Sequence, residues 1–499
     1  MTTGPAEPVS SRVAGPALVI SCLVIVSCAF ALLTGRYGGP DEPSHVIRAA
    51  AVAHGDLRGA DAPGMVDGFR LVEVPLRIGT GDPRCFRHDP RITPQCAAPT
   101  TDRGTVVVAT AAGRYPPYYY AVIGGAARLL GQSDNPLAYR VTSAVLVAGV
   151  LGFALLRLRQ WVSSGAALVV SAMLPPAAWF LFGVVNPNSL EIALFALAWV
   201  GVGEFLIDAR PGRGTDGLTV AAWAAAAAVL IRPVAVLAVP TLLVVLVTGA
   251  SRAQWAPMRS RRRITMVLAP LLGAGLLTVG WHLALAAASS DARTASTIPF
   301  TDAVRRSFDG TTDTVRELVG SMGWLEYSSP NLAQAAWWAV VGLSAGAALL
   351  AGRRLTIAFV ATVISVLAIP LVFELVMYRR VGFIWQGRYS IAAALGVAMV
   401  GAVAVHRLPG RRQRQFRRVA QALPILAAAS LLLSQWHAAR RYTVGIDGSW
   451  RLTATNAWQP PVHPWLLLAA SAVALGALGA LWGSTGSDHV AEHVDDHIR

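Results

Sequence analysis

The sequence contains no lysine, and only 14% of its 499 residues are charged. Because 54% of the residues are hydrophobic, a soluble globular fold is excluded, since it could not bury so much apolar surface. The 42 basic residues are therefore all arginine, and they gather in short loops between apolar runs. This pattern indicates cytoplasmic loops beside anionic membrane lipids, and it argues against nucleic acid as a partner despite the net charge of +15.

Cysteine is also scarce, with four residues of two kinds. Cys22 and Cys28 lie in the first apolar run, where they are expected to be small buried side chains. Cys85 and Cys96 flank a short polar stretch in the first long loop, and they are disulfide candidates if that loop faces an oxidising compartment. Two free thiols are the alternative. A zinc site is not expected, because His88 is the one other soft ligand nearby.

Thirteen apolar runs are candidate membrane spans. They cover residues 16–33, 117–131, 138–156, 164–185, 188–207, 218–231, 233–249, 264–286, 335–351, 355–376, 389–405, 420–436 and 464–482. The first run is not followed by a clear signal-peptide cleavage site, so we expect a retained anchor.

The arginine clusters at 252–263, 353–354 and 407–418 are predicted to be cytoplasmic, which places the long loops on the outside. Alternation from a cytoplasmic N-terminus then fails by one crossing. Either the short run 117–130 is re-entrant, or one of the runs beside Arg232 does not span. Both 12 and 13 crossings remain open.

We therefore predict an all-α polytopic membrane protein with about 12–13 transmembrane helices and surface helices in a long first extracytoplasmic loop. The predicted order is a cytoplasmic N-terminus (1–15), a first transmembrane helix (16–33), an extracytoplasmic loop with an acidic motif (34–116), a transmembrane bundle (117–286), a second extracytoplasmic loop (287–334), a further bundle (335–482) and a polar tail (483–499).

The first polar segment after the first span holds two carboxylates, an imidazole and a guanidinium near the membrane surface. A helix is predicted to begin at Asp41 or Glu42 and to end after His54. Its apolar stripe is expected to rest on the membrane, while Asp41, His45 and Arg48 share an exposed neighbouring face. Two interpretations remain open: a general base beside a lipid headgroup, or charged residues that cap an interfacial helix.

Aromatic and polar residues recur at three later points on the same predicted side. Arg114 precedes the second apolar run and Tyr118 lies at its start, where tyrosines are typical of an interfacial belt but also stack on sugars. Trp324 and Glu326 lie in a glycine-containing turn that is expected to present both side chains. Arg388 precedes a later span, where it binds a lipid phosphate or extends to the headgroups without a role.

These motifs, in this order, resemble a family of bacterial membrane proteins catalogued as domain of unknown function 2142, over residues 16 to about 405. The motifs are Pro40-Asp41-Glu42-Pro43-Ser44-His45, Pro116-Pro117-Tyr118-Tyr119, Asn186-Pro187-Asn188-Ser189, Gly323-Trp324-Leu325-Glu326 and Gln386-Gly387-Arg388-Tyr389. The fourth departs from the expected pattern, because Glu326 stands where an aspartate is expected.

That family in turn resembles the GT-C glycosyltransferases, membrane enzymes with an acidic motif in the first extracytoplasmic loop. The resemblance implies an outward-facing site, a polyprenyl-phosphate sugar as donor and a catalytic carboxylate at Asp41 or Glu42. The expected acceptor is a glycan, lipid or protein of the envelope at a bacterial plasma membrane. No cofactor is required, although a divalent cation is an option.

The resulting hypothesis is an inverting glycosyl transfer in which Asp41 deprotonates the acceptor. Glu42 supports the acceptor or an optional cation, and His45 together with Arg48 holds the acidic loop. The substrate-binding candidates are Arg48, Arg114, Tyr118, Trp324, Glu326, Gln386, Arg388 and Tyr389.

Two other functional classes remain. A transporter or flippase of lipid-linked saccharides is expected to place ionisable residues inside spans and to show a repeat. The sequence shows no clear repeat, and Glu191, Arg232, His282 and Glu374 are interpreted as isolated residues near span ends or breaks. The other class is a non-catalytic assembly protein of the envelope.

Overall fold

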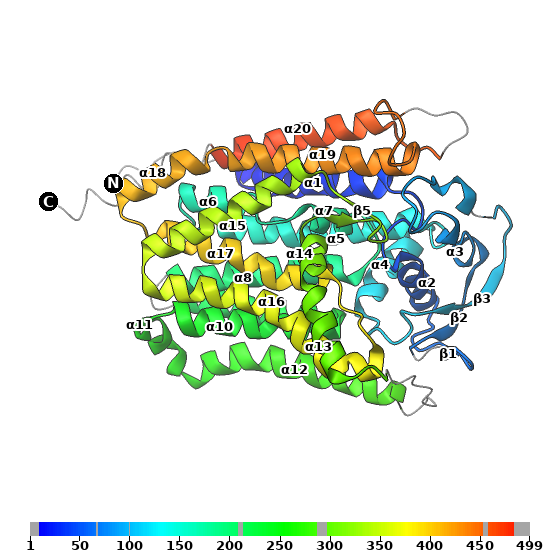
Figure 1. The fold of residues 1–499 in the computed structure, drawn as a ribbon, viewed down its shortest axis with the longest axis horizontal. Helices are drawn as coiled ribbons and strands as arrows, with labels where there is room; N and C mark the ends of the chain where they lie inside the picture. The colour runs from blue at the N-terminus through cyan, green and yellow to red at the C-terminus, as the bar shows by residue number, and fades with distance from the viewer. Residues whose placement is uncertain are drawn as a thin grey trace.

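The computed structural model describes residues 9–65, 68–98, 100–207, 213–286, 297–452 and 458–483. The predicted terminal segments 1–15 and 483–499 lie mostly outside these residues. The long helices run side by side as a bundle, and a small lobe with a three-stranded sheet covers one end of it (Figure 1). We call this end the sheet end.

Within the described residues, nine helices have the length and apolar composition to cross a membrane. They are α1 (Val9–Leu33), α5 (Pro136–Leu158), α8 (Pro187–Ile207), α12 (Arg261–Ala286), α15 (Asn331–Ala351), α16 (Arg353–Val381), α17 (Ile391–His406), α19 (Leu423–Thr443) and α20 (Pro464–Gly483). The prediction of a polytopic all-α membrane protein is confirmed.

Three further segments complete the bundle. Two are the shorter apolar helices α9 (Arg213–Ile231) and α10 (Val239–Gly249), and α10 follows the 3-10 turn η3 (Pro233–Ala238). The third is a broken pair, α6 (Ser164–Val170) and α7 (Pro176–Phe182). The apolar run over 164–185 is interrupted, because Pro175 and Pro176 cannot donate the backbone hydrogen bonds of a continuous helix.

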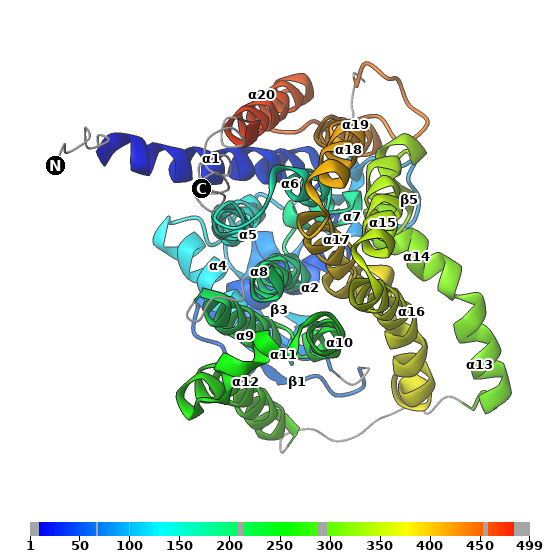
Figure 2. The same cartoon turned by 90° about the vertical axis from the view of Figure 1, so that its left-hand side faces the viewer.

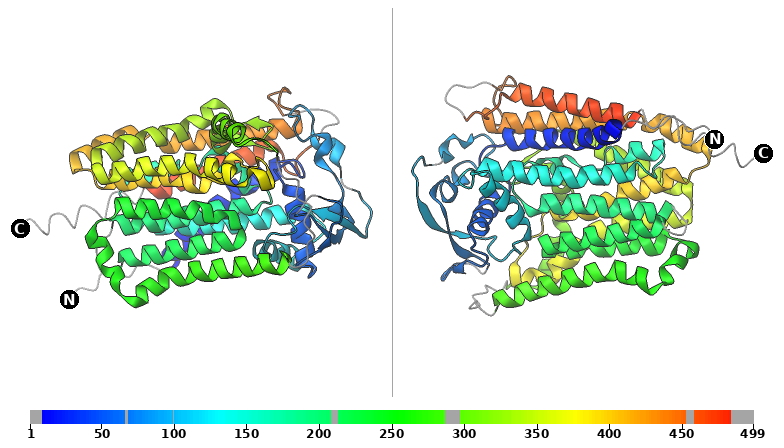
Figure 3. Two further views of the ribbon diagram at one scale, coloured as in Figure 1. Left: turned by 60° about the horizontal axis from the view of Figure 1, so that its bottom comes forward. Right: turned by 180° about the vertical axis from the view of Figure 1, so that it is seen from behind.

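The run at 117–131 forms a short helix, which agrees with the alternative in which this run does not cross the membrane. Helix α4 (Tyr118–Leu129) has 12 residues and is about 18 Å long, too short for a hydrocarbon core of about 30 Å. Beside α4, the described residues thus hold nine helices long enough to span, two shorter apolar helices and one broken pair. The described start of α1 and end of α20 lie at the same end of the bundle (Figure 3).

The arginine-rich connections meet at the end opposite the sheet (Figure 1). They contain α11 (Arg252–Trp255), the 3-10 turn η4 (Ala256–Arg259) and the basic helix α18 (Gly410–Ala420). We call this end the arginine end. The polar motifs singled out in the sequence lie toward the sheet end, so the bundle separates the two sets of loops as the arginine distribution predicts.

The lobe at the sheet end is formed by the first long loop. Its antiparallel sheet has the order β1 (Ala60–Asp61), β2 (Arg70–Pro75) and β3 (Thr105–Thr110), with Val72 opposite Val108. The remaining elements of the loop are α2 (Glu42–Ala53), α3 (Leu76–Gly79) and the 3-10 turns η1 (Pro83–Cys85) and η2 (Pro94–Ala97). A disulfide joins Cys85 to Cys96, as predicted.

Helix α2 begins and ends where the sequence predicts, but its surroundings differ. Val46, Ala49 and Ala50 are buried, and so are His45 and Arg48 on the face expected to be exposed. Helix α4 covers one side of α2, where Gly124 lets the two backbones approach closely at Ala49. The prediction of an exposed polar face is therefore wrong, because the lobe and α4 enclose both faces.

The second long loop contributes two amphipathic helices and a small hairpin. These elements are α13 (Phe300–Asp309), α14 (Thr311–Gly320), β4 (Ser321–Met322) and β5 (Tyr327–Ser328). Helix α14 packs against the 3-10 turn η5 (Gly387–Ser390) that precedes α17, because Gly387 has no side chain to hold the two segments apart.

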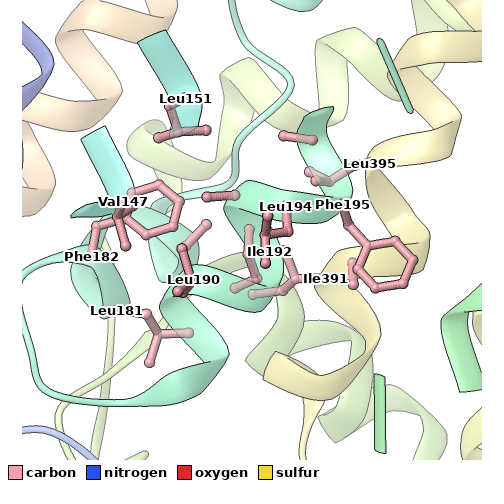
Figure 4. Close-up of a cluster of buried hydrophobic side chains, with 14 of the residues drawn as sticks. Val147, Leu151, Leu181, Phe182, Leu190, Ile192, Leu194, Phe195, Ile391 and Leu395 are labelled. Carbon is pink, nitrogen blue, oxygen red and sulfur yellow. The ribbon is translucent and has the colours of Figure 1, made fainter. Parts of the chain in front are cut away.

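The core of the bundle surrounds α8. Figure 2, which looks along the bundle, places α8 near its centre, and residues 187–206 of this helix are all buried. A helix that is apolar on every side is expected in such a position. Figure 4 shows one packed cluster, formed by Val147 and Leu151 of α5, Leu181 and Phe182 of α7, Leu190, Ile192, Leu194 and Phe195 of α8, and Ile391 and Leu395 of α17.

Candidate active site

The turn between α1 and α2 carries Asp41 at the sheet end of the bundle. The Tyr442 hydroxyl donates to the carbonyl of Gly38 (2.8 Å), and the Asn186 amide donates to the carbonyl of Pro40 (3.0 Å). A Cβ on Gly39 would lie 2.7 Å from Val184 Cβ, so the turn needs glycine to pass this point. Asp41 itself has φ of 58°, a left-handed conformation that aspartate tolerates better than most residues.

Glu42 is fully buried and forms a two-point ion pair with Arg140 of α5. Arg140 Nε donates to Oε1 (2.6 Å) and Nη2 to Oε2 (2.7 Å). The backbone N–H groups of Gly39 and Val185 also donate to this carboxylate (both 3.1 Å). With four donors around it and 0% exposure, Glu42 is enclosed by protein groups, and its catalytic role stays a prediction.

Arg140 also ties α5 to the end of α1. Its Nη1 donates to the carbonyls of Ala31 (3.0 Å) and Thr34 (2.6 Å), and its Nη2 donates to that of Gly35 (2.7 Å). The carbonyls at a helix C-terminus have no partner within the helix, and a cation there is stabilising. The Glu42–Arg140 pair therefore fixes the turn that carries Asp41.

Asp41 contacts Arg388, which is 347 residues away in the sequence. Arg388 Nη2 donates to Asp41 Oδ2 and to the Tyr389 hydroxyl (3.2 Å). The Arg388 side chain is 4% exposed, whereas the Asp41 side chain is 51% exposed and does not cap α2. Nε and Nη1 of Arg388 are buried without an acceptor among the described residues, so the guanidinium retains hydrogen-bonding capacity for an anion.

A second buried guanidinium lies on the ring of Tyr389. The Cζ atoms of Arg232 and Arg388 are 4.2 Å and 5.1 Å from the centre of this ring. Arg232 Nη1 donates to Oε2 of Glu191 (2.7 Å), which also accepts from the Asn188 amide (3.0 Å). The interpretation of Arg232 and Glu191 as isolated residues is therefore wrong, because the break after α9 and the start of α8 bring them together.

His45 is buried among aromatic side chains close to Asp41. Its Nδ1 is 2.8 Å from the Tyr120 hydroxyl, and its ring packs edge-on against Tyr115, with the ring centres 5.4 Å apart. Burial lowers the pKa of His45 to about 3, although the neighbouring Asp41 carboxylate opposes this shift. His45 is therefore neutral near pH 7, and it holds the loop rather than binding phosphate as a cation.

The Arg48 side chain lies inside the lobe and does not extend to the exposed side of Asp41. Its Nη2 donates to the carbonyls of Leu57 (2.7 Å) and Tyr115 (3.2 Å), and the side chain is fully buried. The arrangement agrees with the expected role in holding the acidic loop. Because these contacts lie inside the lobe, the substrate-binding role of Arg48 stays a prediction.

The electrostatic environment keeps Asp41 ionised. Burial of its surroundings opposes ionisation, but the Arg388 guanidinium, with smaller contributions from His45 and Arg232, holds the pKa of the Asp41 carboxyl below its usual value. A half-exposed carboxylate beside a buried guanidinium provides a proton acceptor and an anion-binding group in one place.

The turn that carries Trp324 and Glu326 packs against the turn that carries Asp41. Both side chains are predicted substrate ligands, but they make different contacts. The Trp324 indole N–H donates to the carbonyl of Tyr37 (2.9 Å), and Arg87 lies over its ring at 5.4 Å. Glu326 points inward, where it accepts from Arg441 Nε (3.1 Å). Burial raises the pKa of Glu326 while Arg441 opposes the shift. The prediction that Glu326 is presented to a substrate is wrong.

The remaining predicted ligands are distributed around the cluster. Tyr118 is exposed at the start of α4. Gln386 precedes Arg388, and its Oε1 is buried without a donor among the described residues. Arg114 is half-buried, and its carbonyl accepts from the indole N–H of Trp281 on α12 (3.0 Å). The substrate-binding roles of Tyr118, Trp324, Gln386 and Arg114 stay predictions.

Across the part of the chain that the structure describes, no group of three or more histidine, cysteine, aspartate or glutamate side chains could hold a metal ion. The Asp41 cluster instead combines Asp41, Arg388, Tyr389, Arg232 and Glu191. Its chemistry is that of a general base next to a site for an anion.

The sequence and the structure were compared with those of known proteins. The model of the family described as predicted membrane protein (DUF2142) matches residues 23–397. The chain belongs to this family. The match includes every ordered motif from which the resemblance was inferred, and it extends over most of the DUF2142 protein's length.

Other comparisons give distant similarity or none. The DUF2142 protein is similar to ArnT from Cupriavidus metallidurans bound to undecaprenyl phosphate (13% identity, TM-score 0.44) and in the apo state (12%, 0.45). These alignments cover 96% and 95% of this chain and 77% of each ArnT chain. An oligosaccharyltransferase from Archaeoglobus fulgidus in complex with zinc and sulfate is similar at 15% identity and a TM-score of 0.34. This alignment covers 86% of the present chain and 53% of the oligosaccharyltransferase chain. No curated protein matches.

Three residues of the DUF2142 protein's site were not identified from the sequence. Arg140, Glu191 and Arg232 lie near the ends of apolar segments, where an ionisable side chain is costly unless it has a partner. The cost of burying a charge indicates that each of these residues has a partner. It does not identify the partner, which is 98 residues away for Arg140 and 41 for Arg232.

Proposed function

We propose that this DUF2142 protein is a membrane glycosyltransferase that moves a sugar from a polyprenyl-phosphate donor to an envelope glycan, lipid or protein. The observation that carries the proposal is the Asp41–Arg388 contact. It joins a half-exposed carboxylate to a buried guanidinium whose Nε and Nη1 have no acceptor among the described residues. A base beside an anion site is what transfer from a sugar phosphate requires.

In the proposed reaction, Asp41 takes the proton of the acceptor hydroxyl. The acceptor oxygen forms a bond to the anomeric carbon, and the bond from that carbon to the phosphate oxygen breaks. The lipid phosphate leaves with the bonding electrons and gains one negative charge, which Arg388 stabilises by charge-assisted hydrogen bonds. The anomeric configuration inverts, and no metal ion is needed for the charge balance.

The residues around this pair hold it in place. The Glu42–Arg140 pair fixes the backbone of the Asp41 turn, and Arg232 with Glu191 supports the Tyr389 ring on which Arg388 rests. Because the arginine-rich loops lie at the opposite end of the bundle, the positive-inside rule supports an active site on the extracytoplasmic face.

The test is sugar transfer by the purified protein in nanodiscs, with a panel of polyprenyl-phosphate sugars and envelope acceptors. Replacing a general base typically lowers the rate by about 10² to 10⁴, so Asp41→Asn is expected to lose transfer by at least roughly 100-fold. Asp134→Asn is the matched control, because Asp134 also pairs with an arginine, Arg77, but on the lobe surface.

Two results would contradict the proposal. Full transfer by Asp41→Asn would exclude Asp41 as the base. No transfer from any donor, together with movement of the donor lipid between leaflets, would favour a flippase. Adding a chelator tests the optional cation, and unchanged transfer is expected.

A further inference from the structure

The proposed base and the proposed phosphate ligand are bound to each other in the structure. Arg388 Nη2 contacts Asp41 Oδ2, whereas Arg388 Nε and Nη1 have no acceptor within the described residues. The side chain of Asp41 makes no capping hydrogen bond to α2. The free protein therefore has its base engaged by the same guanidinium that the donor phosphate needs.

The charges of the cluster balance before any substrate binds. Asp41 and Glu191 are two carboxylates, Arg232 and Arg388 are two guanidinium groups, and His45 is neutral near pH 7. Arg232 is already paired with Glu191 at 2.7 Å. Because Nε and Nη1 of Arg388 are buried, a phosphate approaches the guanidinium where Nη2 contacts Asp41, and it must compete with Asp41 there.

Asp41 is the partner that can leave. Arg388 is 4% exposed and lies against the Tyr389 ring, which Arg232 covers as well. The Asp41 side chain is half-exposed, and its turn is held by the backbone contacts of Gly38 and Pro40 rather than by the carboxylate. Rotation of the Asp41 side chain releases it toward solvent without moving the turn.

We infer that the Asp41–Arg388 contact is a latch that a phosphate-bearing donor opens, so that the donor binds before the acceptor is deprotonated. The part of this inference that concerns deprotonation of the acceptor rests on the proposed function. In the free protein the latch holds the carboxylate away from acceptor chemistry. Once the phosphate occupies Arg388, the carboxylate is free to take the acceptor proton, and a sugar is already present to receive the acceptor oxygen.

The first test measures binding and needs no activity. Undecaprenyl phosphate is the probe, titrated into nanodiscs that contain wild-type protein, Asp41→Asn or Arg388→Gln. Asparagine tolerates a left-handed backbone, so Asp41→Asn is expected to fold normally. Removing a competing half-exposed carboxylate is expected to tighten binding by roughly twofold to fivefold, whereas Arg388→Gln is expected to weaken binding at least about tenfold.

The control variant is Asp134→Asn, which removes a carboxylate between α4 and α5 that pairs with Arg77 of the lobe, and it is expected to leave binding unchanged. Equal or weaker binding by Asp41→Asn would overturn the latch, as would unchanged binding by Arg388→Gln. Asp41→Gly serves as a second variant with the same expectation if Asp41→Asn shows a lower unfolding midpoint, because glycine adopts the left-handed backbone without strain.

The second test separates the latch from the proposed function. Initial rates measured against both substrates, with the product lipid phosphate as inhibitor, are expected to show an ordered mechanism in which the donor binds first. Transfer with random order, or with the acceptor binding first, would overturn the latch and leave the glycosyltransferase intact. Absence of transfer from every donor would overturn the proposed function, and the donor-first order with it.

Discussion

Replacing Glu42 by glutamine is expected to impair stability, whereas replacing its neighbour Asp41 by asparagine is expected to impair catalysis. The two carboxylates are adjacent in the sequence, but their side chains are 0% and 51% exposed. Glu42 accepts from both Arg140 nitrogens and from two backbone N–H groups. In Glu42→Gln, Arg140 stays buried without its counter-charge, and the new amide N–H₂ faces donors instead of acceptors.

The magnitude follows from the burial of the pair. Removing one partner of a buried ion pair costs about 3–5 kcal/mol, a large part of the roughly 5–15 kcal/mol that stabilises a typical protein. Asp41→Asn removes a half-exposed pair, for which about 0–1 kcal/mol is expected. Arg140→Gln is expected to destabilise as strongly as Glu42→Gln, and the double variant less than the sum of the two.

The assay is thermal unfolding in detergent, measured beside transfer for each variant. Arg157→Gln is the control for loss of a guanidinium, because the Arg157–Glu204 pair lies at the arginine end and is partly exposed. A Glu42→Gln protein with wild-type unfolding and no transfer would refute the reasoning and return the catalytic role to Glu42. Strong destabilisation by Asp41→Asn would refute the expectation that this replacement impairs catalysis and not stability.

Three further predictions concern the surroundings of the site. The pKa of His45 is about 3 in the folded protein and roughly 6.5 in the unfolded chain. Between these two pH values only the unfolded chain binds the proton. The free energy of unfolding is therefore expected to fall by about 1.4 kcal/mol for each pH unit of acidification. His45→Gln removes this dependence, so the difference between its unfolding midpoints at pH 7 and pH 5 is expected to be smaller than in wild type; an equal difference would contradict a neutral His45. Replacing Cys85 and Cys96 by serine opens a short closed loop and is expected to cost about 2–3 kcal/mol; an unchanged midpoint under non-reducing conditions would count against it. Glu326→Gln leaves the fully buried Arg441 unpaired and is expected to lower the midpoint as Glu42→Gln does, and a loss of transfer with normal stability would restore Glu326 as a ligand.

The local features of the sequence determine much of the fold. Long apolar runs predict the nine helices of the described residues that can span a membrane, and the arginine loops predict which ends of these helices lie together. The limits of α2 also follow from its local signals. The sequence leaves the fold open where run length is ambiguous, at α4 and at the Pro175–Pro176 break, because an apolar run does not reveal whether its helix is continuous.

The site divides in the same way. Asp41, His45 and Arg388 were identified from motifs that remain visible in the linear sequence. The difference between Asp41 and Glu42 was not visible, because two adjacent carboxylates have the same intrinsic chemistry and differ only in what surrounds them.

The sequence by itself therefore determined a multi-pass membrane protein with its acidic motif at the end of the first span. Only the tertiary structure decided that Arg140 of α5 neutralises Glu42, that Arg388 meets Asp41 across 347 residues, and that Arg232 pairs with Glu191. The physical reason is that hydrophobic periodicity specifies which segments are buried, whereas charge pairing depends on which helices become neighbours.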